Sequence, residues 1–148
     1  MSDFFLTAIM TLDASVRVCV PLIFAAMAGL FAERSGIVDI GLEGKLLMSA
    51  FVAASAASVF GSPWLGLIAG MFASVVLAMI HGFASITYKG NQIVSGVAIN
   101  ILASGLTMIL TLAWFKRGGI TPTLQGDERF LSITLPGVDI IDHIPILG

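Results

Sequence analysis

Four long apolar segments, separated by short polar stretches, dominate the hydropathy pattern of the chain. Each is close to the roughly 20 residues that an α-helix needs to cross the hydrocarbon core of a bilayer. We expect membrane spans at about residues 14–32, 40–60, 63–88 and 93–115. The pattern therefore predicts an all-α fold, a polytopic transmembrane helical bundle of about four spans.

The first expected span carries one cation and one proline. Arg17 lies near its start, where a guanidinium can reach the membrane interface, so we interpret it as an anchor rather than a pathway residue. Pro21 cannot donate a hydrogen bond to the carbonyl of Arg17. The helix should therefore either kink at Pro21 or begin there.

A polar segment at residues 33–45 joins the first two expected spans and holds five charged residues and three glycines. We expect irregular, partly re-entrant backbone that protein surrounds, because unpaired amides in hydrocarbon are costly. Asp39 and Glu43 lie near the start of the second helix, where the helix dipole favours acids, and Lys45 and Arg34 can balance them. We predict that Asp39, Glu43 and Lys45 form a charge-compensated cluster and not a substrate or ion site.

The third expected span follows a Gly61-Ser62-Pro63 turn, which is typical of a tight helical hairpin with a serine cap. Small residues recur along this span at intervals of four, at Gly66, Gly70, Ser74, Ala78 and Gly82. Such a stripe lets helix backbones approach closely in lipid, so it predicts a helix-packing seam. We interpret His81 as a buried histidine bonded to a neighbouring carbonyl or hydroxyl, because no second intramembrane acid lies near it in sequence.

Polar and small residues follow one face of the fourth expected span, at Gly96, Asn100, Ser104, Thr107 and Thr111. A polar stripe on a membrane helix faces protein or water rather than lipid. Two interpretations stay open: hydrogen bonding between helices, and the lining of a solute route. On the second, Asn100, Ser104 and Thr107 are the substrate-pathway candidates.

Composition supports an integral membrane protein and excludes several other classes. The chain has 57% hydrophobic and 11% charged residues and a mean hydropathy of +1.03. A net charge of −2 gives no reason to expect nucleic acid as a partner, and the single cysteine, Cys19, cannot form a disulfide framework. The sequence holds no phosphate-binding GxxxxGK[ST] loop and no plausible metal or nucleophile set. We therefore expect no catalytic activity, metal or cofactor in this chain.

Residues 116–148 are too polar to span a membrane. They predict an extramembrane loop whose apolar end leads toward a further span that the sequence does not contain.

Three motifs, at residues 31–44, 61–66 and 91–100, together resemble the permease subunit of ABC importers. The resemblance is to the nucleoside and simple-sugar branch of the ribose and branched-chain amino-acid permease family, and it covers about residues 6–119. It implies a multi-pass protein of the plasma (inner) membrane that works with a second permease subunit, a cytoplasmic ATP-binding subunit and an extracytoplasmic solute-binding protein. ATP hydrolysis would belong to a partner. Permeases of this family are about twice as long, so the chain resembles an N-terminal half without the ATPase-docking segment.

Basic residues do not decide the orientation by the positive-inside rule. They divide three against four, with Arg34, Lys45 and Lys89 on one face and Arg17, Lys116, Arg117 and Arg129 on the other. The family pattern implies that residues 33–45 lie inside, and that the N-terminus and the loop at 116–148 are extracytoplasmic.

Two other functions remain as alternatives. In half of an ion-coupled secondary transporter or channel, Glu43 or Asp39 would bind a coupling ion at a broken helix. A non-transporting membrane scaffold would use the small-residue seam for assembly. Co-purification of an ATPase would favour the importer over both.

Overall fold

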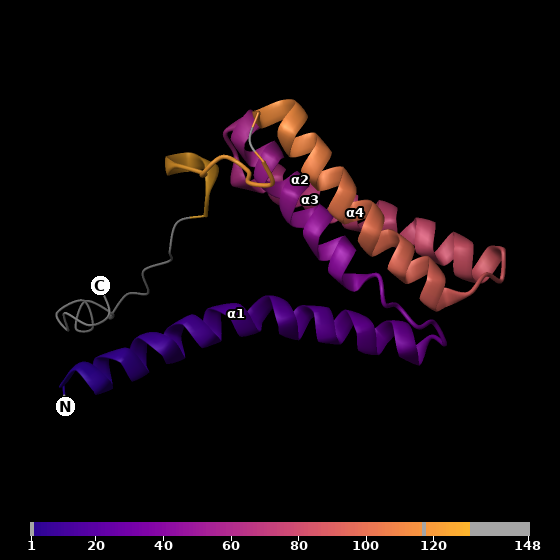
Figure 1. Ribbon diagram of the computed structural model, residues 1–148, viewed down its shortest axis with the longest axis horizontal. Helices are drawn as coiled ribbons and strands as arrows, with labels where there is room; N and C mark the ends of the chain where they lie inside the picture. Colours follow the sequence, from indigo (N-terminus) through magenta and orange to yellow (C-terminus); the bar gives the residue numbers. More distant parts are fainter. Residues whose placement is uncertain (1, 117, 131–148) are drawn as a thin grey trace. The chain divides into compact units, whose positions relative to one another are not determined.

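A computed structural model describes residues 2–116 and 118–130, and its long elements are four α-helices (Figure 1). They are α1 (Ser2–Arg34), α2 (Leu42–Phe60), α3 (Pro63–Gly82) and α4 (Gln92–Phe115). All four are long and apolar enough to cross a membrane. The all-α, four-span fold class is confirmed, whereas the end of the predicted loop, at 131–148, lies outside the described residues.

Helix α1 begins well before residue 14, where the span was expected to start, and it runs through Pro21 without a break. The expectation that the helix begins at the proline is therefore wrong. Arg17 forms an exposed ion pair with Asp13, one turn earlier, at 3.0 Å. This pair neutralises the cation locally.

Residues Ala25–Phe130 form one compact unit, in which α2 packs against both α3 and α4 (Figure 1). The buried core of this unit is a small cluster from the three helices: Met48, Phe51, Leu77, Ile99 and Ala103. Most other large apolar side chains on these helices are exposed. This is the pattern of a membrane protein, whose apolar exterior faces lipid or further membrane helices.

The turn between α2 and α3 is a tight hairpin. Gly61 adopts a left-handed conformation (φ 61°) and ends α2, and Pro63 occupies the first turn of α3. Ser62 stands at the N-cap position in extended conformation, but its side chain makes no cap hydrogen bond. The predicted hairpin is present, without the predicted serine cap.

Helix α3 continues as one π-helical turn, η1 (Phe83–Thr87). The amide of Tyr88 donates to the carbonyl of Phe83 at 3.2 Å, five residues back, which is the π-helical pattern. Asn91 then caps α4 by accepting from the amides of Ile93 and Val94, at 3.0 and 3.2 Å. The third expected span, 63–88, is thus an α-helix with a π-helical end.

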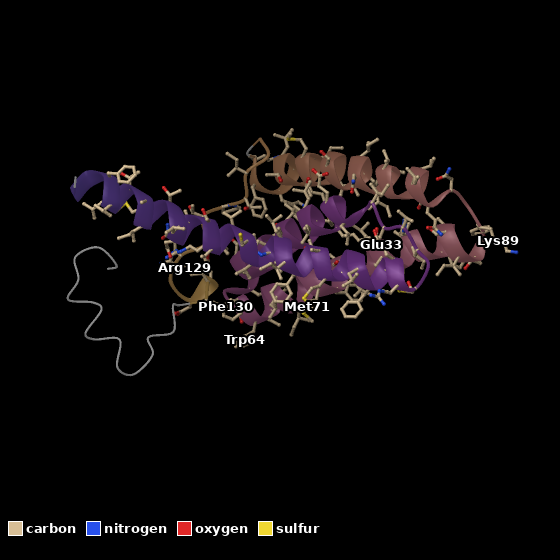
Figure 2. All side chains as sticks on the ribbon, turned by 90° about the horizontal axis from the view of Figure 1, so that it is seen from below. Glu33, Trp64, Met71, Lys89, Arg129 and Phe130 are labelled. Atoms are coloured by element: carbon tan, nitrogen blue, oxygen red, sulfur yellow. The ribbon has the colours of Figure 1, made fainter. Side chains whose placement is uncertain are left out.

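Beyond α4 the described chain returns to the start of α3. The short 3₁₀ turn η2 (Gly126–Glu128) is closed by the Glu128 carboxylate, which accepts from the amide of Gln125 at 3.1 Å. The ring of Phe130 meets the edge of Trp64 with a centroid distance of 5.0 Å (Figure 2).

Candidate functional site

Helices α2 and α4 line a groove of about 590 Å³, which we call the α2–α4 groove. Its wall combines aliphatic and aromatic side chains with hydroxyl groups. The lining residues are Leu47, Ala50, Phe51 and Ala54 of α2, Ser104, Thr107, Met108 and Thr111 of α4, and Gly119, Ile120 and Thr121 beyond it.

The hydroxyls of the groove keep acceptor capacity. Thr107 donates to the carbonyl of Ser104 at 3.1 Å, and Thr111 donates to the carbonyl of Thr107 at 2.5 Å. Each hydroxyl proton therefore goes to the helix backbone, while the lone pairs of each oxygen stay available. The groove can accept hydrogen bonds from a polyhydroxylated solute.

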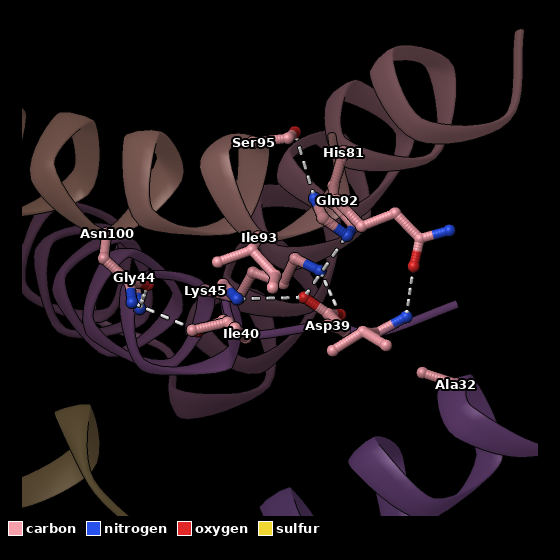
Figure 3. Close-up of polar contacts among 12 residues, drawn as sticks. Ala32, Asp39, Ile40, Gly44, Lys45, His81, Gln92, Ile93, Ser95 and Asn100 are labelled. Carbon is pink, nitrogen blue, oxygen red and sulfur yellow. Dashed lines mark hydrogen bonds and ion pairs between the residues drawn. The ribbon is translucent and has the colours of Figure 1, made fainter. Parts of the chain in front are cut away.

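Asn100 occupies a different place from the other two pathway candidates. Its Oδ1 accepts from the amide of Gly44 at 2.7 Å, and its Nδ2 donates to the carbonyl of Ile40 at 3.1 Å (Figure 3). The structure therefore puts Ser104 and Thr107 on the groove, but Asn100 outside its lining, as a clamp between α4 and the start of α2.

Glycines bring the same two elements into direct backbone contact. A Cβ atom on Gly44 would lie 2.8 Å from the Cα of Asn100, and one on Gly96 would lie 2.9 Å from the amide nitrogen of Gly41. Neither position has room for a methyl group. Sequence reasoning missed this contact, although Gly41, Gly44 and Gly96 all lie in segments already recognised as unusual.

A buried polar cluster fastens the linker between α1 and α2. Asp39 forms an ion pair with Lys45 of α2, and its Oδ1 also accepts from the amide of Gly41 at 3.1 Å (Figure 3). The side chains of Asp39 and Lys45 are only 11% and 6% exposed. Burial of such a pair makes removal of one partner costly, because the other charge stays in a medium that excludes water.

His81 of α3 belongs to the same cluster. Its Nδ1 lies 3.1 Å from the hydroxyl of Ser95, while its Nε2 has no hydrogen-bond partner among the described residues and lies 3.9 Å from Oδ1 of Asp39. The predicted hydroxyl partner is present. No acid lies near His81 in sequence, but the fold brings the linker carboxylate of Asp39 to α3. We call Asp39, Lys45, His81 and Ser95 the linker cluster.

Glu43 does not join the linker cluster. It is exposed and makes no ion pair with any described residue, and the same holds for Arg34. Of the three residues predicted to balance one another, the structure brings together Asp39 and Lys45 alone. The third side chain beside this pair is that of His81, whose Nε2 lies 3.9 Å from Oδ1 of Asp39.

The small-residue stripe of α3 has two different environments. A Cβ atom on Gly66 would lie 2.7 Å from the carbonyl oxygen of Ala53, and one on Gly70 would lie 2.8 Å from that of Ser49. Ser74 is half-buried and Ala78 is exposed. A Cβ atom on Gly82 would meet no described atom within 4 Å. Close packing against α2 is thus seen at the first two positions, and a seam along all five stays a prediction.

Metal ligation has no candidate in the described ranges, which hold no group of three histidine, cysteine or acidic side chains placed to share an ion.

Comparison with known proteins gives one family. The model of the branched-chain amino acid transport system / permease component family matches residues 11–135. The chain is 38% identical, over 91% of its length, to the guanosine ABC transporter permease protein NupQ of Bacillus subtilis, of which it covers 42%. It is 33% identical, over 93% of its length, to the putative glucose ABC transporter permease protein TsgC13 of Haloferax volcanii, covering 40% of that protein.

A third relative is the nucleoside ABC transporter permease protein NupC of Lactococcus lactis, with 32% identity over 86% of this chain and 40% of that protein. The chain thus spans about two-fifths of the length of these curated relatives. No solved structure matched it. With a family match over most of its residues and four helices able to span a bilayer, the chain belongs to the branched-chain amino acid transport system / permease component family, as a multi-pass protein of the plasma membrane.

Proposed function

We propose that the chain supplies the N-terminal part of a permease subunit in an ATP-driven ABC importer for nucleosides or simple sugars, and that the solute passes along the α2–α4 groove. The names of the relatives, which are a guanosine, a nucleoside and a putative glucose ABC transporter permease protein, support this solute class. The observation that carries the route is the row of groove hydroxyls, Ser104, Thr107 and Thr111.

The chemistry of the groove suits such solutes. Ribose and glucose carry several hydroxyl donors, and the hydroxyls of Thr107 and Thr111 have free acceptor capacity because their own protons bond the backbone. Phe51 and Met108 add apolar and polarizable surface, against which a base or a sugar face can pack. Among the described residues, no charged side chain lines the groove, which suits a neutral solute.

The partners follow from the same proposal. A second permease subunit would complete the membrane pathway, a cytoplasmic ATP-binding subunit would hydrolyse ATP, and an extracytoplasmic solute-binding protein would deliver the solute. Residues 33–45 would face the cytoplasm, and the loop at 116–148 would lie outside and lead to the next span. An ion-coupled transporter is disfavoured, because Lys45 already neutralises Asp39 and Glu43 is exposed.

Uptake by the full-length permease with its partner subunits tests the route. Thr107→Val keeps the side-chain shape but removes the hydroxyl, so ATP-dependent uptake of guanosine or glucose should fall about tenfold per assembled complex, as expected for about 1.4 kcal/mol. Thr87→Val is the control, because Thr87 is exposed on η1 and does not line the groove. Equal uptake by both variants would contradict the route, and uptake driven by an ion gradient without ATP would contradict the importer.

A further inference from the structure

We propose that the contact between α2 and α4 at the linker end of the groove is a gate, and that the linker cluster is its latch. The inference rests on the proposed solute route and adds the point at which that route is closed.

The gate is the place where the two helices leave no space between them. At Gly44 and Gly96 an added Cβ would lie within 3 Å of opposing backbone atoms, so backbone touches backbone. About one helical turn beyond Gly44 and its α4 neighbour Asn100, at Leu47 and Ser104, the groove begins. It extends from there to residues 119–121. A solute that enters beside residues 119–121 therefore meets closed backbone at the linker end.

Asn100 holds the gate closed with two hydrogen bonds. Its amide bonds both Gly44 and Ile40, so moving α2 away from α4 breaks both contacts together (Figure 3). Gln92 of α4 also accepts from the amide of Val38 at 2.6 Å, which ties the linker to α4. This bond would keep the linker at Val38 and Asp39 beside α4 when the start of α2 moves.

In the latch, His81 is placed to become a second partner of the Asp39 carboxylate. Lys45 on α2 pairs with it in this structure, while Nε2 of His81 on α3 lies 3.9 Å away with no hydrogen bond among the described residues. If the Ser95 hydroxyl donates to Nδ1, the neutral imidazole carries its proton on Nε2, directed at Asp39. A shift of about 1 Å would bring this contact to hydrogen-bond distance. His81 would then hold Asp39 when α2 carries Lys45 away.

This exchange of partners by Asp39 explains why Nε2 of His81 is buried close to the Asp39 carboxylate and yet has no hydrogen-bond partner among the described residues. Opening the gate without His81 would leave Asp39 underpaired in a buried site, which is costly. His81 is thus a positioning residue that acts through Asp39 and lowers the cost of the open state.

Cysteine labelling from each face of the membrane tests the gate. The full-length permease, assembled with its partners and with Cys19 and all other native cysteines replaced, carries Ser104→Cys in the groove. A membrane-impermeant maleimide is added to right-side-out or inside-out vesicles. In the parent, Ser104→Cys should react from the face that carries residues 118–121 and not from the linker face.

Two changes should open the gate. Gly44→Ala pushes α2 off Asn100, and Asn100→Ala removes the clamp without adding bulk, so each should raise labelling from the linker face at least about tenfold, or about 1.4 kcal/mol. Gly105→Ala is the matched control, because a Cβ there meets nothing within 4 Å among the described residues. If the Gly44→Ala variant does not accumulate in the membrane, labelling of the Asn100→Ala variant from the linker face tests the gate.

The outcomes separate the gate from the route. One-sided labelling in every variant, or two-sided labelling in the parent, overturns the gate and leaves the groove as a route. No labelling of Ser104→Cys from either face overturns the route and the gate with it.

The latch is tested by uptake. His81→Leu should reduce uptake per assembled complex, while Ser104→Cys labelling in the His81→Leu background stays one-sided, as in the parent. His81→Gln, which keeps a hydrogen-bond donor, should restore uptake. Equal uptake by His81→Leu and the parent overturns the latch.

Discussion

Asp39 is the buried acid of the linker cluster. It pairs with Lys45, accepts from the amide of Gly41 and faces His81, all in a site with little solvent. Glu43, only four residues away, is exposed. The sequence grouped the two acids because both lie near the expected start of the second helix, where the helix dipole favours acids. In the structure α2 begins at Leu42, so Asp39 belongs to the linker instead.

Neutralising these two acids should therefore have unequal effects. Asp39→Asn leaves Lys45 buried without a counter-charge and should destabilise the folded protein by about 3–5 kcal/mol. Glu43→Gln changes an exposed side chain and should stay within about 0.5 kcal/mol of the parent. Membrane abundance and thermal stability in detergent measure both. A larger loss for Glu43→Gln than for Asp39→Asn would contradict the assignment of the buried pair.

The double variant Asp39→Asn/Lys45→Met separates loss of the pair from loss of packing. Removing both charges also removes the unpaired ammonium, so this variant should recover most of the stability lost in Asp39→Asn. No recovery would mean that the Asp39 bonds to the linker backbone, rather than its pairing with Lys45, stabilise the fold.

At the scale of elements, the α2–α3 hairpin depends on backbone approach at two glycines. Gly70→Leu must place a large side chain where a Cβ atom alone would lie 2.8 Å from the carbonyl oxygen of Ser49. It should destabilise the bundle by about 1–3 kcal/mol or more. Gly82→Leu is the matched control, since a Cβ atom there has no described neighbour within 4 Å. Equal heat resistance of the Gly70→Leu variant and the parent in detergent would show that close packing there is not required.

Local sequence signals predicted the elements well where the determinants are local. Hydropathy located all four helices, and Gly61 with Pro63 located the hairpin, because turn geometry depends on the few residues in the turn. The π-helical turn at Phe83–Thr87 had no such signal.

The candidate site was predictable only in part, for the same reason. The helical stripe on α4 predicted that Ser104 and Thr107 share one face, because periodicity alone decides which residues share a face, and both line the groove. Periodicity could not show that Asn100, on that stripe, would use both amide ends on the backbone of residues 40–44. Likewise, the approach of Asp39 to His81 depends on how the linker crosses the ends of three helices.

At the scale of the whole molecule, most large apolar side chains of the described residues are exposed rather than buried. Lipid and further membrane helices can cover such surface. The chain spans about two-fifths of the length of its curated relatives.

Protection of a groove cysteine by the transported solute tests the central claim most directly. In the full-length transporter, assembled with its partners in a cysteine-free background, Ser104→Cys should react with a water-soluble maleimide, and saturating guanosine or glucose, whichever is transported, should slow the reaction. Ile109→Cys, on an exposed apolar part of α4, should show no solute dependence. Unchanged labelling of Ser104→Cys at saturating solute, or protection of Ile109→Cys instead, would contradict the assignment of the α2–α4 groove as the solute route.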